Sequence, residues 1–361
     1  MRVLHGTYEI AGQGMVLAEG LRAHGVLADS LAYRVDWDGR VPRIVVDLDR
    51  LDPVSRVGAM LATRRRLESQ YDVFHFHFGS SFFGSGAPYG GSGLLARLLA
   101  RRDVPALKKA GKTVVYHFHG CEVRNRTHML AHHARAACTE CLPFCDPGRQ
   151  KALLADASRH ADRVFFSTRD LAESVPNGRE LPLAIESARW EEAARAHPLP
   201  DPSRRDGVDG PVVIAHAPTS RWIKGTRHVE AAFERLRGEF PLLELRLIEK
   251  LPWAEMPRVL ASCDLLVDQL FMGWYGLLAI EGMSLGKAVV CHLREDFLAS
   301  APGCPVVDAT SDNLVEVLRA LIRDPARRMA LGAAGQAWAR ARHDQAEVGR
   351  TLLAHYEELR K

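Results

Sequence analysis

The stretch DLLVDQLFMGWYGLLAIEGMSLGKAVV, residues 264–290, decides the fold. It starts as an apolar run typical of a buried strand, passes through a glycine-containing turn, and continues from near Gly276 as an apolar helical pattern. Gly286 ends that pattern, and a β-branched run at 288–290 follows. Strand, helix and strand in this order predict two parallel strands joined by a crossover helix.

The same alternation extends in both directions from this stretch. Strands that alternate with helices predict a parallel sheet with helices on both faces, so we expect an α/β protein. Residues 196–210, with three prolines and several charges, interrupt the alternation and are predicted to be a linker between two doubly wound units. The strand-like runs lie at residues 3–4, 43–46, 72–76, 113–116 and 163–166, and again at 211–215, 243–248, 264–267, 288–290 and 305–307.

The composition narrows the class of protein. The chain has 361 residues, of which 47% are apolar and 25% charged, as expected for a soluble globular protein of about two domains. The net charge of +4 is too small for a dedicated nucleic-acid binder. No apolar run is long enough to cross a membrane, and the N-terminus lacks the apolar core of a secretion signal. Because seven cysteines without such a signal indicate a reducing compartment, we expect a cytoplasmic protein.

The helix that begins near Gly276 is a candidate anion site. The first amides of a helix have no acceptor within the helix, so they can bind a group such as a diphosphate. Glu281 lies about one turn further on, where its carboxylate could accept hydrogen bonds from a ribose diol. Any strand-helix-strand unit with a glycine-containing turn shows the same pattern, so the pattern alone identifies no ligand.

Residues 264–290 closely resemble the donor site of retaining glycosyltransferases of the GT-B architecture, in glycosyltransferase family 4 (glycosyl transferases group 1), which includes sucrose synthases and bacterial mannosyltransferases. The resemblance implies two Rossmann-like, doubly wound domains that face a cleft. The first would span residues 1–200 together with a crossing C-terminal helix at 344–361, and the second would span 211–343. The matching positions are Tyr275, Gly276, Leu277, Glu281, Met283, Gly286, Lys287, Val289 and Val290.

The resemblance also implies roles for residues in this stretch. The amides of Gly276 and Leu277 would bind the donor diphosphate, and Glu281 would bind the donor ribose. The family has a second glutamate, which touches the donor sugar, at the position of Gly273. Asp268, at the carboxyl end of the strand, either compensates for that missing carboxylate or caps a turn.

A second motif lies at residues 214–226, where the first strand of the second unit leads into a helix. A cation at such a turn can neutralise a departing diphosphate, although a lysine there can also simply solvate the helix start. Lys224 and Gly225 match a Lys-Gly pair of the resembled family. The family's arginine would fall on Thr219, and Arg221, two positions away, is a plausible substitute.

In the first unit, a loop follows the first strand and contains Gly12 and Gly14. It lacks the third glycine of a dinucleotide fingerprint, so it does not indicate a nicotinamide site. In the resembled family the equivalent loop lines the sugar-diphosphate pocket.

A histidine motif ends a later strand of the first unit. His119 resembles the family histidine that contacts the donor sugar. His117 shares its face of the strand, and His75 and His77 repeat the pattern one strand earlier. A structural role is the alternative for each of these histidines.

Four thiols are the candidates for a structural zinc site, because a closed tetrahedral site needs four ligands. A redox pair, a disulfide and unligated thiols are the alternatives, with His128, His132 and His133 as substitute ligands. The resembled family needs no metal or other cofactor for catalysis. The four residues are Cys121, Cys138, Cys141 and Cys145.

Basic residues gather between residues 91 and 112. A solvated helix face explains them, and peripheral contact with an anionic membrane is the alternative that we do not expect. They are Arg97, Arg101, Arg102, Lys108, Lys109 and Lys112.

These observations and the resemblance lead to one functional expectation. The chain is expected to move a sugar, with retention at the anomeric carbon, from a UDP- or GDP-sugar to a hydroxyl or amine acceptor held by the first domain. Lys224 and Arg221 would stabilise the leaving diphosphate, and His119 would position the sugar. The alternatives are a catalytically degenerate nucleotide-sugar-binding subunit and a nucleotide-sugar epimerase on the same scaffold.

Overall fold

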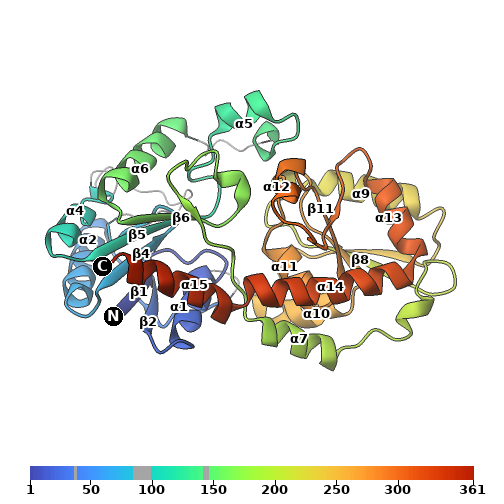
Figure 1. Cartoon of the computed structure of the whole chain (residues 1–361), viewed down its shortest axis with the longest axis horizontal. Coiled ribbons are helices and arrows are strands. Elements are labelled where there is room, and N and C mark those ends of the chain that lie inside the picture. Colours follow the sequence, from blue (N-terminus) through green and yellow to red (C-terminus); the bar gives the residue numbers. More distant parts are fainter. Residues whose placement is uncertain (36–38, 84–98, 141–145) are drawn as a thin grey trace. The chain divides into compact units, whose positions relative to one another are not determined.

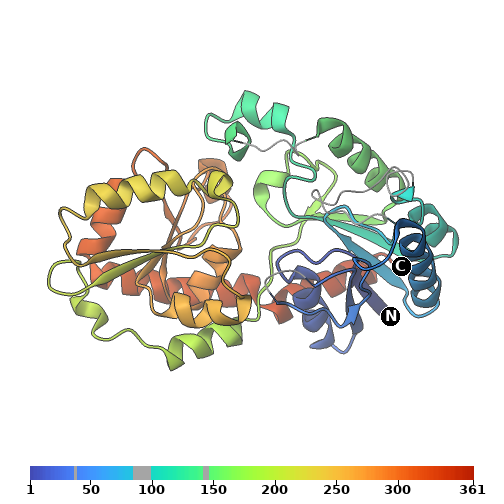
Figure 2. The ribbon, with the colours of Figure 1, turned by 180° about the vertical axis from the view of Figure 1, so that it is seen from behind.

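The computed structural model describes residues 1–35, 39–83, 99–140 and 146–361 (Figure 1). The chain forms two compact units, each with its own sheet and core (Figure 2). In the described residues, no helix is both long enough and apolar enough to span a bilayer. The first unit contains Met1–Arg126, Leu142–Ala184 and Gln345–Lys361, and the second contains Thr127–Cys141 and Ile185–Asp344.

The first unit is built on a parallel sheet with the strand order β3-β2-β1-β4-β5-β6-β7. Its strands are β1 (Arg2–Gly6), β2 (Leu27–Ala32), β3 (Ile44–Val45), β4 (Val73–His77), β5 (Thr113–Phe118), β6 (Arg163–Phe166) and β7 (Arg179–Glu180). Its described α-helices are α1 (Gln13–Arg22), α2 (Pro53–Glu68), α4 (Val104–Lys109), α6 (Pro147–His160) and α15 (Gln345–Glu358).

The second unit has a parallel sheet with the strand order β12-β11-β10-β8-β9. Residues 264–290 form β10, α11 and β11, the predicted strand-helix-strand unit, and the two parallel sheets confirm the predicted α/β fold. The strands are β8 (Val212–His216), β9 (Leu243–Leu247), β10 (Leu265–Val267), β11 (Ala288–Cys291) and β12 (Val307–Asp308). The α-helices are α5 (Arg126–His132, whose first residue falls in the first unit), α7 (Ser187–Ala196), α8 (Arg221–Lys224), α9 (Thr226–Leu236), α10 (Met256–Ala261), α11 (Leu277–Ser284), α12 (Glu295–Ala299), α13 (Leu314–Arg323) and α14 (Pro325–His343).

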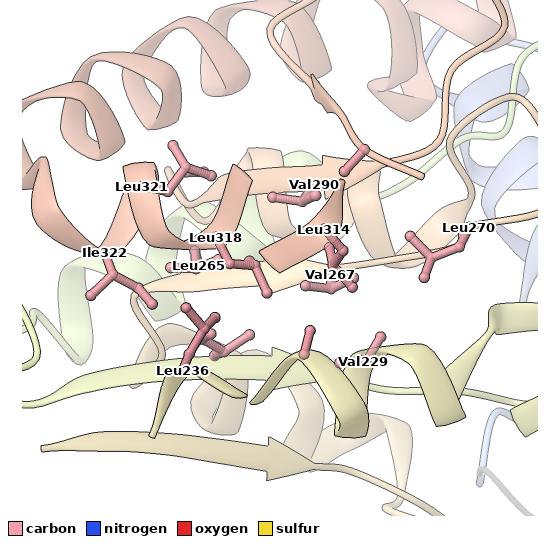
Figure 3. Packing of buried hydrophobic residues seen from close by; sticks show 14 of the residues in the cluster. Val229, Leu236, Leu265, Val267, Leu270, Val290, Leu314, Leu318, Leu321 and Ile322 are labelled. Atoms are coloured by element: carbon pink, nitrogen blue, oxygen red, sulfur yellow. The ribbon is translucent and has the colours of Figure 1, made fainter. Parts of the chain in front are cut away.

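The core of the second unit lies between its sheet and the helices α9 and α13. Apolar residues of β10 and β11, such as Val267 and Val290, point toward Leu318 of α13, while Val229 and Leu236 come from α9 (Figure 3). All five side chains are at most 1% exposed. The strands of a parallel sheet covered on both faces are apolar throughout, which explains why β10 appears in the sequence as an uninterrupted apolar run.

The second unit begins earlier than the sequence predicts. Residues 185–200 belong to it, so the boundary lies at Ala184 and not at residue 200. The proline-rich segment 196–210 is also anchored there, because the Arg205 guanidinium donates to both carboxylate oxygens of Asp264 at 2.7 and 2.9 Å. Both side chains are buried, and Arg328 in turn donates to the Arg205 carbonyl. A charge pair between distant segments cannot be read from local composition.

Glycines allow helices to pack closely in both units. In the first unit α1 and α15 meet at Gly20 and Gly349, and a Cβ on Gly349 would lie 2.4 Å from the Gly20 carbonyl carbon. In the second unit a Cβ on Gly332 of α14 would lie 1.9 Å from the carbonyl oxygen of Gly286. Both distances are far below van der Waals contact, so neither position accepts a side chain without movement of the backbone.

We expect Gly349→Val to lower the free energy of unfolding by about 1–3 kcal/mol, because the added methyl groups force α15 away from α1. Urea unfolding followed by circular dichroism measures the change. The matched control is Gly58→Ala in α2, where a Cβ meets no atom within 4 Å. This control is expected to gain about 0.5–1 kcal/mol from helix propensity. Equal effects of the two substitutions would contradict the packing argument.

Candidate functional site

The candidate site lies where β10 ends and α11 begins. Asp268, the first residue after β10, accepts a hydrogen bond from Lys224 Nζ through Oδ1 at 2.7 Å. Its Oδ2 accepts from the backbone N–H of Gly276 at 2.6 Å. Gln269 Oε1 accepts a second bond from Lys224 Nζ at 2.7 Å, and its amide nitrogen donates to the carbonyl of Trp274 at 2.6 Å. These contacts fix the lysine and the loop before α11 as one unit.

The topology explains why Lys224 meets Asp268. The strands β8 and β10 are parallel neighbours, so the segments that follow them emerge at the same edge of the sheet. Lys224 ends the short helix α8, and Gly225 follows in the left-handed region at φ 75°. A Cβ on Gly225 would lie 3.0 Å from Phe271 and 3.2 Å from Leu270. Glycine is therefore needed beside the lysine to let α8 approach the loop after β10.

The opposite charges of Lys224 and Asp268 nearly cancel at this edge of the sheet. The Lys224 side chain is 13% exposed and that of Asp268 is 0% exposed, so the pair is largely screened from water. An ammonium group has three N–H donors, of which Asp268 and Gln269 take two. A Cβ on Gly276 would lie 3.2 Å from Lys224 Nζ, which places the ammonium beside the positive end of the α11 dipole. An anion could bind here by accepting hydrogen bonds from the Lys224 ammonium and from the backbone amides at the start of α11.

His216 joins this edge to the body of the sheet. It ends β8, and its ring nitrogens contact the Val267 carbonyl at 2.8 Å and the Thr226 hydroxyl at 2.9 Å. Since a carbonyl only accepts, Nδ1 carries the proton and Nε2 accepts from the threonine. Burial lowers the pKa of His216 below 6.5, with the nearby Lys224 charge acting in the same direction. The sequence motif contains this residue but gave no indication of its role.

The other residues predicted in the second unit lie in different surroundings. Glu281 is on α11 and is buried. The N–H of Gly276, predicted to bind a diphosphate, donates instead to Asp268. Leu277, the other residue predicted to bind the diphosphate, is the first residue of α11. Arg221 pairs with Glu230 and with Glu249, the latter at 2.9 Å, and Thr219 is exposed. The structure therefore brings together Lys224, Asp268 and the start of α11, and it gives Arg221 carboxylate partners of its own.

The position of Gly273 disfavours a side chain. Its φ is +72°, and a Cβ there would lie 2.7 Å from Cγ and Cδ of Arg294. The backbone N–H of Arg294 donates to the Gly273 carbonyl at 2.8 Å, and the guanidinium pairs with Asp296 at 2.7 Å and lies over the ring of Phe297. This loop is therefore built around a glycine, and a glutamate at this position would need a strained φ and a displaced Arg294 side chain.

In the first unit the glycine loop already holds a carboxylate. Gly12 has a φ of +78° and precedes α1, and the backbone N–H of Gly14 donates to Glu9 Oε1 at 2.9 Å. Glu9 thus occupies the start of this helix, where a carboxylate is stabilised by the helix dipole. Glu9 precedes the two glycines in the sequence, and its negative charge was the signal that could have predicted a carboxylate at the start of α1.

The histidines of the first unit form a cluster. His77 is hydrogen bonded to His5 at 3.0 Å and to His119 at 3.0 Å, and His117 lies beside His119. Burial lowers the pKa of His77 to about 3 and lowers the pKa of the other histidines in the cluster as well. The sequence predicted that His117 and His119 share a face, but it missed His5.

Only part of the predicted thiol cluster can be assessed. Cys121 is partly buried and its Sγ accepts from Arg124 at 3.2 Å, and Cys138 is buried beside Met129 and Ala136. Cys141 and Cys145 lie outside the described residues, as does Arg97 of the basic segment. The zinc site stays a prediction.

Comparisons with known proteins establish the fold. No protein-family model matches the sequence, and no curated protein matches it significantly. Among solved structures, HepE from Anabaena in complex with UDP-glucose matches with a TM-score of 0.63 and 13% identity, over 99% of each chain. Sucrose-phosphate synthase from Thermosynechococcus elongatus matches with a TM-score of 0.64 and 13% identity, over 99% of this chain and 98% of that one.

A third match extends the same likeness. The UDP-forming α,α-trehalose-phosphate synthase from Burkholderia xenovorans has a TM-score of 0.60 and 13% identity, over 100% of this chain and 99% of that one. These similarities confirm that the chain has the expected GT-B fold of two Rossmann-like domains.

The buried, neutral His216 predicts a pH dependence of stability. Its pKa is lower in the folded chain than the ordinary 6.5, so below that pH the unfolded chain binds a proton that the folded chain does not. The contribution of His216 is therefore complete above about pH 6.5 and falls as the pH drops, by at most about 1.4 kcal/mol per pH unit.

Urea unfolding of the wild type and His216→Gln, between about pH 7.5 and pH 5, measures this contribution. We expect the advantage of the wild type over the variant to shrink toward the acid end. A difference that stays constant across this range would contradict the assignment of His216 as a buried neutral ring.

Proposed function

We propose that this protein is a retaining glycosyltransferase that takes a sugar from a nucleotide diphosphate sugar and transfers it to a hydroxyl or amine acceptor. The observation that carries the proposal is the Lys224 ammonium, held by Asp268 and Gln269 beside the start of α11. A fixed cation next to a helix N-terminus suits a group that gains negative charge as it leaves.

The proposed chemistry needs stabilisation of the leaving group and no protein nucleophile. The bond between the anomeric carbon and the diphosphate oxygen breaks, and the acceptor oxygen or nitrogen forms its bond to that carbon on the same face. The acceptor's proton passes to the diphosphate oxygen. Lys224 would donate its third N–H to the departing diphosphate, and the amide of Leu277 in the first turn of α11 would donate beside it.

UDP is the proposed nucleotide, because structures of the same fold are described with UDP or UDP-glucose bound. Glu281, buried on α11, would accept hydrogen bonds from the ribose hydroxyls. The roles of Gly12, Gly14 and His119 toward the sugar, the role of Arg221, and a cytoplasmic location stay predictions.

A second candidate function is a nucleotide-sugar-binding subunit without catalysis. The specific observation in its favour is Gly273, which stands where the resembled family has a sugar-contacting glutamate and whose positive φ and contact with Arg294 disfavour a side chain. Asp268 does not replace that carboxylate freely, because both of its oxygens accept hydrogen bonds from Lys224 and Gly276.

We expect Lys224→Gln to bind UDP about ten- to a hundredfold more weakly than the wild type, since it loses a charge-assisted hydrogen bond to the diphosphate. Isothermal titration calorimetry with UDP measures the affinity. The matched control is Lys250→Gln, a substitution of an exposed lysine in the same unit, which should leave the affinity unchanged. Equal affinities of Lys224→Gln and the wild type would contradict the proposed anion site.

Hydrolysis of UDP-glucose by the purified chain separates the two candidate functions. A transferase without its acceptor transfers the sugar slowly to water, so we expect UDP to be released in proportion to protein concentration and more slowly with Lys224→Gln. A binding subunit would saturate with UDP in calorimetry and release no glucose from UDP-glucose at any protein concentration.

A further inference from the structure

The first unit carries five histidines on one face of its sheet, and the proposed transfer reaction leaves most of them without a role. His5 lies on β1 opposite His75 of β4, and His77 of β4 lies opposite His117 of β5. His119 follows one residue after β5. The alternate residues of β4 and β5, such as Phe74 and Tyr116, belong to the core on the other face. The strands thus place imidazoles where a parallel sheet normally places apolar side chains.

Three of these rings form a chain of hydrogen bonds that, in the described structure, leaves the nitrogen at each end without a partner. His5 Nδ1 contacts His77 Nε2, and His77 Nδ1 contacts His119 Nε2, both at 3.0 Å. Each neutral imidazole carries one proton, so two bonds use two of the three protons. The remaining N–H lies at one end of the chain and a lone pair lies at the other, and both end nitrogens are buried without a partner among the described residues.

His117 also has buried ring nitrogens that lack a partner in the described segments. Its side chain is 0% exposed and lies near the Leu181 backbone, but within the described part of the chain neither ring nitrogen makes a hydrogen bond of ordinary distance and angle. A buried N–H or lone pair without a partner destabilises the folded chain, so such groups in a native structure call for a partner. The orphaned nitrogens of His117 and His119 lie at the carboxyl end of β5.

We propose that His77, His117 and His119 bind one divalent transition-metal ion. Their ligand atoms all lie within 4.8 Å of one another. Nitrogens bound to one tetrahedral zinc at 2.0–2.1 Å are about 3.4 Å apart, so the rings need only small movements to converge on an ion. The ion would use lone pairs of His117 and His119, and His77 would exchange its hydrogen bond to His119 for a bond to the ion. Such an ion would tie the carboxyl ends of β4 and β5 together.

The alternative triad of His5, His75 and His77 is less suitable. Its three side chains are all 0% exposed, so an ion has no direct access to any of them. His119, by contrast, is only partly buried. Within the described ranges, the proposed triad therefore has unsatisfied nitrogens on His117 and His119 and one ligand, His119, that is only partly buried.

The chemistry of the ligands defines the class of ion. Neutral imidazoles suit zinc, copper, nickel and iron, whereas magnesium and calcium require oxygen ligands. Burial keeps these rings unprotonated near neutral pH, which is the form that binds metal. Glu122 accepts a hydrogen bond from the His119 backbone N–H, and its Oε2 is buried without a partner among the described residues. Burial raises the pKa of Glu122 to about 7, and a cation nearby would favour its ionised form, which would offset part of the charge of the ion.

Cobalt(II) alone is the probe that tests this site, because its visible d–d absorption reports four-coordinate binding. We expect the chelator-treated full chain to bind one equivalent of Co²⁺. His117→Gln and His119→Gln should each bind at least about tenfold more weakly. The control His197→Gln removes an exposed histidine and should bind like the wild type. Circular dichroism of each variant checks that it folds, and partly buried His119 is the substitution that the fold tolerates best.

Three outcomes would overturn the proposal. The first is the absence of saturable Co²⁺ binding to the folded wild-type chain. The second is binding that is lost in His75→Gln but retained in His117→Gln and His119→Gln, which would move the ion to the other triad. The third is a thiolate-to-cobalt charge-transfer band in the near ultraviolet, which would place the ion on cysteines. The test does not depend on the proposed transferase activity.

Discussion

The buried ion pair between Lys224 and Asp268 is the interaction on which the candidate site depends. A fully buried carboxylate is tolerated only when it is paired and hydrogen bonded, and Asp268 meets this requirement through Lys224 and the Gly276 N–H. The pair joins the segment after β8 to the loop before α11, although 44 residues separate the two side chains in sequence. Removal of either partner would leave a buried charge without its counterion and would release the lysine from its place beside the helix.

The two units have the same architecture, but different charged side chains lie at the N-termini of α1 and α11. In the first unit Glu9 accepts from the Gly14 N–H, so the positive end of α1 already has an anionic partner. In the second unit a cation lies beside α11, and the carboxylate that holds it takes only the N–H of Gly276. Electrostatics therefore favour binding of a diphosphate at α11 over binding at α1.

Features that depend on a short segment of sequence could be predicted from the sequence alone. Residues 264–290 gave β10, α11 and β11, and the Lys-Gly pair gave the position of the cation, because each depends on a short segment. The two possible roles of Asp268 could not be separated, since its partner comes from a distant strand-loop segment. The early boundary of the second unit was missed for the same reason, because α7 belongs to that unit through its contacts with α10 and α11, which lie far from it in sequence.

Sheet order explains the remaining differences. The alternation of Phe and His predicted that His75 and His77 share a face, but His5 joins them only because β1 lies beside β4, which the sequence does not reveal. Gly273 shows the reverse case. The sequence showed a glycine where the resembled family has a glutamate, and only the structure shows that Arg294 packs against this glycine.

The measurement that tests the central claim most directly is a crystal structure of the chain with UDP bound. We expect a β-phosphate oxygen within hydrogen-bonding distance of Lys224 Nζ and of the first amides of α11, while Asp268 keeps its bond to the Gly276 N–H. UDP bound with its diphosphate away from Lys224, or a Lys224 ammonium that has no contact with it, would contradict the account.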